Sequence, residues 1–375
     1  MKVATPRIIN GSASIFLDCL RLGAALMVLY RHAFDRWFPT KAYRSAWPGE
    51  PSHVAVIVFF VLSGYVIAHT TISNNRGGMQ YAQARLSRLC SVVIPVIIIT
   101  VLIQLLVMHI NPEVFLKVDR GRGNAVLRYL LSAFYMNELW FLSGAPPING
   151  SLWSLSFEFW YYTIFGIWAF RRPGWQSTAL LILAIVIAGP KIIVMMPVWL
   201  AGYLAYRIPA PVIAKWKAWL TIFLILLAGY LVARVLPPLP YVIHLGPLYY
   251  ANQFFTDWVL CVFVAGALWI LPAGSAKYVH TRAEGWFRAV ADVTFPLYVL
   301  HYPLLVLWRA VYGFHFNDTA QMWKALICIV IIVAVIGVVL EKQRPWWSAF
   351  FKKLLIFLRK KYHSLISTQK KPINS

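Results

Sequence analysis

Charged residues are scarce in this chain, since Asp, Glu, Lys and Arg together make up only 13% of its 375 residues. A soluble protein carries about 25% charged residues, so the composition excludes a soluble globular fold. The sequence also lacks a hydrophilic block between its apolar runs. We therefore expect one membrane-embedded unit, rather than the roughly two or three soluble domains that length alone suggests.

Cysteines are few as well, and their positions exclude several kinds of chemistry. None of them pairs at metal-ligand spacing, so we expect no disulfide framework, no metal site and no thiol nucleophile. A cleavable signal peptide is not expected either, because the first apolar stretch is long and carries charges. The four cysteines lie in or beside apolar runs, at Cys19, Cys90, Cys261 and Cys328.

Acidic residues are the rarest charged class, with 12 Asp and Glu against 35 Lys and Arg and a formal charge of +23. A nucleic-acid partner is not expected, because the basic residues form no single soluble face. They follow membrane topology instead: 22 lie on the side of the predicted spans that includes both termini, 11 lie on the other side, and two lie in the first span. This bias predicts cytoplasmic N- and C-termini.

Apolar residues dominate what remains, at 60% of the chain with a mean hydropathy of +0.67. Runs of membrane length recur throughout and predict an all-α polytopic membrane protein with about ten transmembrane helices in one bundle. The segment 127–142 is apolar but too short for a span, which leaves a re-entrant or interfacial placement. The predicted spans are 15–34, 53–72, 89–109, 152–170, 177–190, 192–207, 216–236, 256–272, 292–312 and 324–341.

Two parts of unequal length are predicted. Residues 1–341 form the transmembrane domain, and residues 342–375 form a basic cytoplasmic tail. In the tail, aromatic and aliphatic residues alternate with basic pairs, which is typical of an interfacial helix held by anionic lipid. A solvated tail that only sets topology is the alternative.

The first span carries ionisable residues that are costly in hydrocarbon. Arg21 and His32 are eleven residues apart, so they share one helix face at depths that differ by about 16 Å. Asp18 precedes Arg21 by three residues and is placed to pair with it. The alternative is an end-of-helix ion pair with an interfacial histidine. If these residues are functional, we expect the helix face that carries them to line a water-filled cavity inside the bundle.

Glu158 enters the fourth span from the same side as His32, within "WSLSFEFWYY". A carboxylate beside an imidazole fixes its tautomer and raises its basicity, so we expect Glu158 to pair with His32. The alternative is an interfacial anchor in an aromatic belt that includes Trp153.

Three further features of the sequence are weaker candidates. Ser63, followed by Gly64, is either a nucleophile or part of a close helix contact. Arg85 and Arg88, three residues apart at the start of the third span, suit the phosphates of a nucleotide, although membrane topology alone also explains them. His301, with Tyr298 one turn before it, is either a substrate contact or a hydrogen-bonded structural histidine.

Taken together and in this order, these segments resemble the membrane-bound acyltransferase 3 family over nearly the whole chain. Small departures, such as Cys19 where the family usually has glycine, affect local packing only. The matching motifs are Arg21-X10-His32, "FFVLSG" at 59–64, Arg85-xx-Arg88, "WSLSFE" at 153–158, Gly202 in "VWLAGYLAYR", "FPLYVLH" at 295–301 and a loose "EKQRP" at 341–345.

The resemblance implies an O-acyltransferase in a membrane, here expected to be the bacterial cytoplasmic (inner) membrane. The implied donor is cytoplasmic acyl-CoA, most often acetyl-CoA, which is a co-substrate, so no bound cofactor is expected. The implied acceptor is a hydroxyl of a glycan or lipid-linked saccharide. The resemblance implies that Arg21 and His32 are catalytic, with His32 as general base or acyl carrier. Glu158 would orient His32, and Asp18 would hold Arg21. Arg85 and Arg88 would bind the phosphates of the donor.

Several alternatives remain open from the sequence. Acceptor contacts are expected at Ser63, Trp153, Tyr298 and His301. The acceptor could instead be a small hydroxylated natural product. A transporter or flippase of a polysaccharide precursor would also carry intramembrane charges and a broken helix around Gly189, and a non-catalytic assembly protein is a third possibility. The oligomeric state is not predicted.

Overall fold

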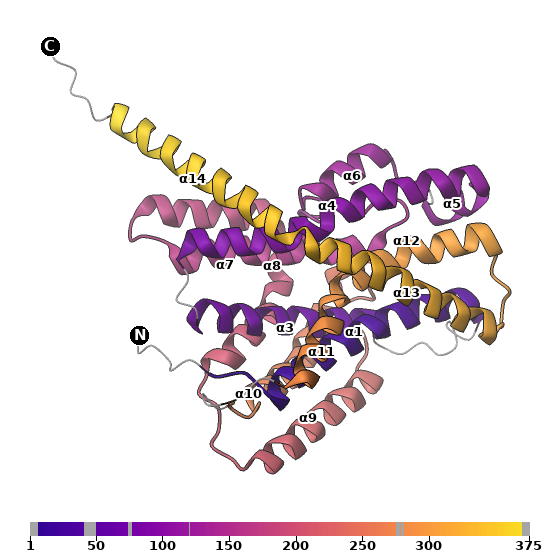
Figure 1. The fold of residues 1–375 in the computed structure, drawn as a ribbon, viewed down its shortest axis with the longest axis horizontal. Coiled ribbons are helices and arrows are strands. Elements are labelled where there is room, and N and C mark those ends of the chain that lie inside the picture. Colours follow the sequence, from indigo (N-terminus) through magenta and orange to yellow (C-terminus); the bar gives the residue numbers. More distant parts are fainter. Residues whose placement is uncertain are drawn as a thin grey trace.

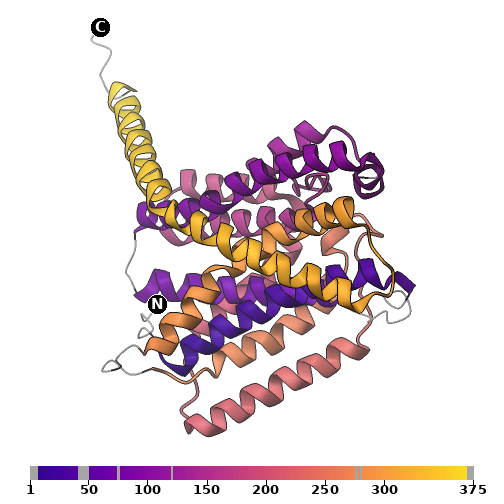
Figure 2. The same ribbon diagram turned by 45° about the vertical axis from the view of Figure 1, so that its right-hand side comes forward.

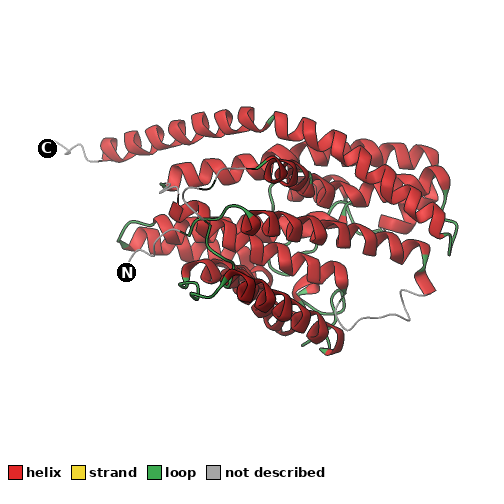
Figure 3. Cartoon of the chain, turned by 60° about the horizontal axis from the view of Figure 1, so that its bottom comes forward, coloured by secondary structure: helices red, strands yellow, loops and turns green. Residues whose placement is uncertain are grey.

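The computed structural model describes residues 7–40, 50–73, 77–119, 121–274, 278 and 281–369. Every regular element in these residues is a helix, as the predicted fold class requires, and most of the helices lie in one bundle (Figures 1 and 3). The α-helices are α1 (Ser12–Trp37), α3 (Pro51–Ser73), α4 (Gly78–Ile110), α5 (Pro112–Asp119), α6 (Ala125–Ala133), α7 (Trp153–Phe170), α8 (Trp175–Arg207), α9 (Lys215–Val235), α10 (Phe254–Trp269), α11 (Arg282–Asp292), α12 (Thr294–Tyr312), α13 (Thr319–Lys342) and α14 (Arg344–Gln369), with short 3-10 helices η1 (Gly150–Leu152) and η2 (Tyr249–Ala251).

Seven segments of the described chain are long and apolar enough to cross a membrane, which identifies an integral, multi-pass membrane protein. The predicted number of ten spans is not confirmed. Two predicted spans correspond to shorter helices, α7 with 18 residues and α10 with 16. Two others, 177–190 and 192–207, are joined in the single 33-residue helix α8.

Helix α8 nevertheless reverses direction near its middle. Gly189 has φ 78° and ψ 175°, a left-handed conformation that breaks the helix. A straight helix of 33 residues would place its ends about 50 Å apart. Arg207 at the end of α8 instead lines the same small cavity as Arg171, which lies just before the helix begins. The second half of α8 therefore runs back toward the end of the bundle where α8 begins, as a separate span would.

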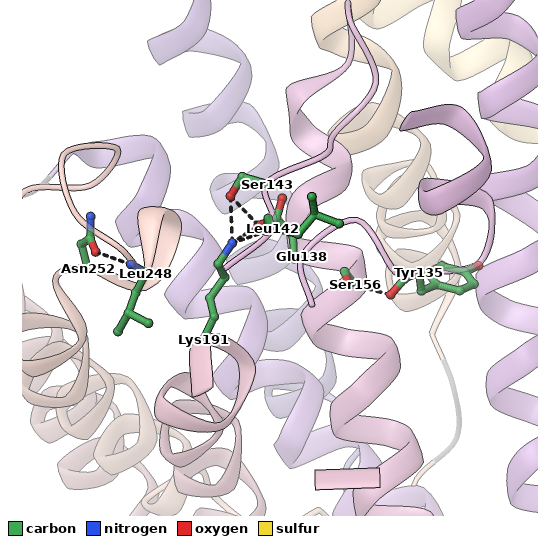
Figure 4. Close-up of polar contacts among 8 residues, drawn as sticks. All are labelled: Tyr135, Glu138, Leu142, Ser143, Ser156, Lys191, Leu248 and Asn252. Atoms are coloured by element: carbon green, nitrogen blue, oxygen red, sulfur yellow. Dashed lines mark hydrogen bonds and ion pairs between the residues drawn. The ribbon is translucent and has the colours of Figure 1, made fainter. Parts of the chain in front are cut away.

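A buried ion pair stabilises this reversal (Figure 4). Nζ of Lys191 donates to Oε2 of Glu138 at 2.8 Å and to Oγ of Ser143 at 2.8 Å, and both charged side chains are fully buried. The backbone N–H of Trp140 donates to the carbonyl of Ala188 at 3.3 Å. The segment predicted as re-entrant or interfacial is thus helix α6 followed by an irregular loop that packs against the break in α8.

Glycine allows α3 and α8 to approach each other closely. A Cβ atom on Gly64 would lie 2.0 Å from the carbonyl oxygen of Trp199, and one on Gly202 would lie 1.8 Å from that of Val61. Neither contact is sterically possible, so both positions require glycine. This crossing confirms that Ser63-Gly64 marks a tight helix contact.

The bundle has two distinct ends. We call the end where α1 begins the N end, and the end where α1 finishes the far end. Contacts in register show that α12 runs parallel to α1, whereas α3, α7 and the second half of α8 run from the far end to the N end. Which end faces the cytoplasm stays a prediction.

The predicted tail is helical. Helix α14 continues from α13 and projects away from the bundle (Figures 1 and 2). Its first turns pack on α4, where Gln83 donates to the carbonyl of Ser348 at 3.1 Å. A position of α14 at the lipid interface stays a prediction.

Candidate active site

A small cavity of about 100 Å³ near the N end brings together residues from five helices. We call it the inner cavity. Arg21 comes from α1, Arg85 and Arg88 come from α4, Ser63 comes from α3, and Glu158 comes from α7. The motif residues that the sequence analysis placed on separate helices therefore share one polar site.

Arg21 reaches this cavity with Asp18 beside it. Nη1 of Arg21 lies 3.9 Å from Oδ1 of Asp18, which confirms the predicted i, i+3 pair. Asp18 itself does not line the cavity. Asp18 therefore acts on the cavity only through its ion pair with Arg21.

Ser63 and Glu158 belong to one hydrogen-bonded cluster. Oγ of Ser63 donates to Oε1 of Glu158 at 2.9 Å, and the hydroxyl of Tyr162 donates to the same carboxylate oxygen. Nε1 of Trp199 donates to Oγ of Ser63 at 3.2 Å. The cluster holds the carboxylate on the wall that it shares with the three arginines.

Arg85 is positioned by aromatic rings and one hydroxyl. Its guanidinium lies 5.9 Å from the ring centroid of Tyr81 and 5.8 Å from that of Tyr162, and it donates to Oγ1 of Thr70 at 3.1 Å. Aromatic rings and a hydroxyl carry no charge, so these contacts do not neutralise the guanidinium. The inner cavity therefore combines three cations with one carboxylate.

A second, larger cavity of about 760 Å³ lies toward the far end, and we call it the outer cavity. His32 lines it. The imidazole of His32 stacks on that of His301, with ring centroids 5.3 Å apart and planes 19° apart. The ring of Tyr302 meets His32 edge-on at 5.5 Å. His32 is thus a wall residue with aromatic rings behind it.

His301 lies behind His32 and is completely buried. Its Nδ1 is 3.1 Å from the carbonyl of Leu297, and its Nε2 is 3.4 Å from Oγ of Ser151. Such contacts fix the orientation of a histidine ring. His301 therefore supports His32 and does not itself line the outer cavity.

Trp153 and Tyr250 form an aromatic wall of the outer cavity. Their rings stack with centroids 4.3 Å apart and planes 9° apart. Burial raises the pKa of the Tyr250 hydroxyl well above its ordinary value of about 10, so this group stays protonated. Trp153 is consequently a cavity wall residue rather than part of an exposed belt.

Basic side chains outnumber acidic ones around the outer cavity. Among the described lining residues, the acidic ones are Asp35 and Glu50. One of the cations, Arg128, is already paired with Asp119. The cationic residues are Arg36, Lys117, Arg122, Arg128 and Arg309.

Tyr298 connects the two cavities. It lines both of them, as does Val56. The hydroxyl of Tyr298 forms a hydrogen bond of 2.8 Å with Oγ of Ser154, and its ring meets Phe59 edge-on at 5.5 Å. A single aromatic side chain therefore stands where the polar N-end site meets the His32 cavity.

The structure does not bring Glu158 to His32, contrary to our expectation. Glu158 faces the inner cavity, whereas His32 faces the outer one. The reason is that α7 begins inside the protein: the residues before it, such as Ile148, Asn149 and Leu152, are buried. Glu158 therefore lies deeper than a helix that started at the membrane surface would place it.

Sequence reasoning missed two pairs of ionisable residues whose side chains are, among the described residues, at most 2% exposed. One is Glu138 with Lys191, and the other is His53 with Asp257. His53, Lys191 and Asp257 lie at the edges of predicted apolar runs, and Glu138 lies within the apolar segment 127–142. A charge at such an edge looks interfacial in the sequence, and no spacing rule relates two partners 204 residues apart.

Comparison with known proteins gives a consistent picture. A family model described as an acyltransferase domain matches residues 14–341. One similar protein is an O-acetyl transferase of Shigella phage Sf6, 28% identical over 162 residues, covering 40% of this chain and 44% of that protein. Another is the peptidoglycan O-acetyltransferase OatA of Listeria monocytogenes, 25% identical over 182 residues, covering 46% of this chain and 26% of that protein. The matches thus span less than half of each relative, and no solved structure gives a significant match.

Proposed function

Because this chain belongs to the acyltransferase 3 family, we propose that it transfers an acetyl group from acetyl-CoA to a hydroxyl of a glycan or lipid-linked saccharide at the membrane. The choice of acetyl rests on the two relatives, both named as O-acetyl transferases, and the choice of a glycan rests on the one named for peptidoglycan. The bacterial cytoplasmic membrane is the proposed location.

The observation that carries this proposal is the meeting of two chemically different cavities at Tyr298. One cavity is small and rich in arginine, and the other is large and contains a histidine. A transferase whose donor and acceptor arrive from opposite sides of a membrane needs such an arrangement. The acetyl group is small enough to pass a constriction that neither substrate has to cross.

Arg85 and Arg88 would hold the donor. Acetyl-CoA is a polyanion that cannot enter hydrocarbon, and guanidinium groups bind phosphates through paired hydrogen bonds. With the N end in the cytoplasm, as the distribution of basic residues predicts, both arginines are close to the cytoplasmic donor. The pantetheine arm would then point past Arg21 toward Tyr298.

Arg21 and Glu158 would act at the constriction. A guanidinium in a low-dielectric site stabilises negative charge that develops on the thioester oxygen. Asp18, whose Oδ1 lies 3.9 Å from Nη1 of Arg21, would hold that guanidinium in place. Glu158, with Ser63 and Tyr162 on its carboxylate, balances the charge of the three arginines.

His32 would act on the acceptor side. The outer cavity has a volume typical of small-molecule sites, which measure about 300–1,000 Å³, and its aromatic and cationic walls suit a polar sugar. His32 takes part either as a general base for the hydroxyl or as the carrier of the acetyl group. Its stacking on His301 fixes the ring that does this chemistry.

A flippase or transporter is less well supported by the same geometry. The sequence feature that favoured a transporter was the broken helix at Gly189, because broken helices in transporters line the substrate path. Neither Gly189 nor Lys191 lines the inner or the outer cavity, and Trp140 packs directly against the break. A small hydroxylated natural product as acceptor fits the outer cavity as well as a sugar does.

The test uses membrane vesicles from cells that produce the full chain. Acetyl-CoA labelled in its acetyl group is added on the cytoplasmic face, and labelled ester in the envelope glycan fraction is measured. The proposal predicts label that depends on the chain and is released by mild alkali. Vesicles that move unmodified glycan but incorporate no label would favour the transporter instead.

A further inference from the structure

His53 and Asp257 form a buried pair in the wall of the outer cavity, and the roles proposed above do not involve them. Nε2 of His53 lies 2.9 Å from Oδ2 of Asp257, with side chains 2% and 0% exposed. His53 is the third residue of α3, and Asp257 is the fourth residue of α10. The first turns of two helices thus meet at the far end of the bundle.

The carboxylate of Asp257 is fixed at both oxygens. Oδ2 faces His53, and Oδ1 accepts a hydrogen bond from Nε2 of Gln253 at 3.0 Å. A carboxylate held in this way orients its imidazole partner and selects the tautomer with hydrogen on Nε2. The lone pair of His53 is then on Nδ1.

Nδ1 of His53 is the atom that remains for chemistry. No hydrogen bond to it is found within the described part of the chain, and His53 borders the outer cavity. The ring packs parallel to Trp153, with centroids 5.9 Å apart and planes 5° apart. Packing on the ring face leaves only an edge to meet the cavity.

His53 and His32 lie at a similar depth. His53 precedes Ser63 of the inner cavity by ten residues of α3, about 15 Å along the helix. His32 follows Arg21 of the same cavity by eleven residues of α1, about 16 Å. The α7 region also links the two histidines, because Ser151 contacts His301 behind His32 and Trp153 stacks on His53.

We propose that His53, oriented by Asp257, is the general base that accepts the proton of the acceptor hydroxyl. This inference rests on the proposed function and gives that reaction a second histidine. A histidine backed by a carboxylate is the arrangement by which triad-type enzymes activate a hydroxyl, whereas the neighbour of His32 is another imidazole. His32 is then the histidine that meets the acetyl group as it passes Tyr298.

The acceptor oxygen bonds to the acetyl carbonyl carbon, and its proton moves to Nδ1 of His53. The bond from that carbon to its leaving group breaks, the leaving atom being the sulfur of coenzyme A in direct transfer or a nitrogen of His32 if His32 carries the acetyl group. The leaving group takes the proton back from His53, which restores the neutral imidazole of His53 beside the carboxylate of Asp257.

The experiment measures labelled acetyl transfer to the envelope glycan of vesicles that contain His53→Ala, Asp257→Asn or the control His315→Ala. His315 is an exposed histidine that follows α12 at the same end of the bundle. We expect His53→Ala to lower kcat about 100-fold or more with an unchanged KM for acetyl-CoA, and added imidazole to restore part of the rate. Asp257→Asn should lower kcat at least about 10-fold, and His315→Ala should resemble the wild type.

The outcomes separate this proposal from the proposed function. Absence of transfer by the wild type would remove the proposed function itself. Wild-type transfer with undiminished kcat in His53→Ala would overturn the role of His53, as would a loss in a correctly inserted variant that imidazole does not rescue. If His53→Ala fails to insert, the nearly isosteric Asp257→Asn decides, because an unchanged kcat in that variant contradicts the proposal.

Discussion

The imidazole rings of His32 and His301 stack with centroids 5.3 Å apart, so a buried histidine of α12 sets the position of a cavity histidine of α1. Replacing His301 by alanine removes this support, and a displacement of about 1 Å at a reacting group costs about 100-fold in rate. We expect His301→Ala to lower acetyl transfer by about that factor and His301→Phe, which keeps a flat ring, to lower it far less. The test compares the acetyl-transfer rates of the two variants at equal protein levels in the membrane. Equal losses of rate in His301→Ala and His301→Phe would show that ring stacking does not position His32.

Tyr298 lines both the inner and the outer cavity, so if these hold donor and acceptor as proposed, its removal should uncouple the two substrates. Tyr298→Ala leaves a gap that admits water from the outer cavity, so acetyl-CoA should be hydrolysed without an acceptor. The measurement is the release of free coenzyme A thiol in acceptor-free vesicles. Tyr298→Phe keeps the ring and loses only the bond to Ser154, and it should stay close to the wild type. No rise in Tyr298→Ala would mean that the cavities do not communicate there.

Arg85 and Arg88 are expected to bind the donor phosphates. A hydrogen bond to a charged group contributes about 1.5–3 kcal/mol, so Arg85→Gln or Arg88→Gln should raise the KM for acetyl-CoA about 10-fold to 100-fold. The control is Arg172→Gln, which removes an exposed arginine from the loop between α7 and α8. A KM that changes equally in all three variants would assign these arginines to membrane topology alone.

The ion pair between Glu138 and Lys191 is expected to stabilise the reversal of α8. Removing one partner of a buried pair leaves an uncompensated charge and costs about 3–5 kcal/mol, so Glu138→Gln should lower the thermal transition of the purified protein markedly. The double variant Glu138→Gln with Lys191→Met should recover much of that loss.

The control for this prediction is another Glu–Lys pair of the chain, Glu113 with Lys117 on α5. Its side chains are 79% and 61% exposed. Exposed pairs contribute little, so Glu113→Gln should leave the thermal transition almost unchanged. Similar effects of Glu113→Gln and Glu138→Gln would contradict the role of the buried pair.

Much of this architecture follows from the sequence, because hydropathy determines which segments can cross a membrane. The face shared by Arg21 and Asp18 followed from helical periodicity and is confirmed. Even the reversal at Gly189 was visible as two predicted spans. Helix periodicity and glycine chemistry are local properties, and local properties can be read from one sequence.

The pairings across the bundle could not be predicted in this way. Glu158 was expected beside His32 because its depth was counted from the start of a span, yet a buried loop precedes α7 and shifts the helix inward. His53 and Asp257 are separated by 204 residues and each begins an apolar run. Their contact depends on how α3 and α10 pack, which no periodicity within either helix encodes.

The proposed acetyl transfer depends most on His32, and one comparison of variants tests this role directly. Vesicles containing the wild type, His32→Gln or His109→Gln at equal levels receive acetyl-CoA labelled in its acetyl group, and alkali-labile label in the envelope glycan is counted. His109 is an exposed histidine in the last turn of α4, away from both cavities. We predict transfer by the wild type and by His109→Gln, and a loss of about 100-fold or more in His32→Gln. Transfer by His32→Gln at the wild-type rate would contradict the account.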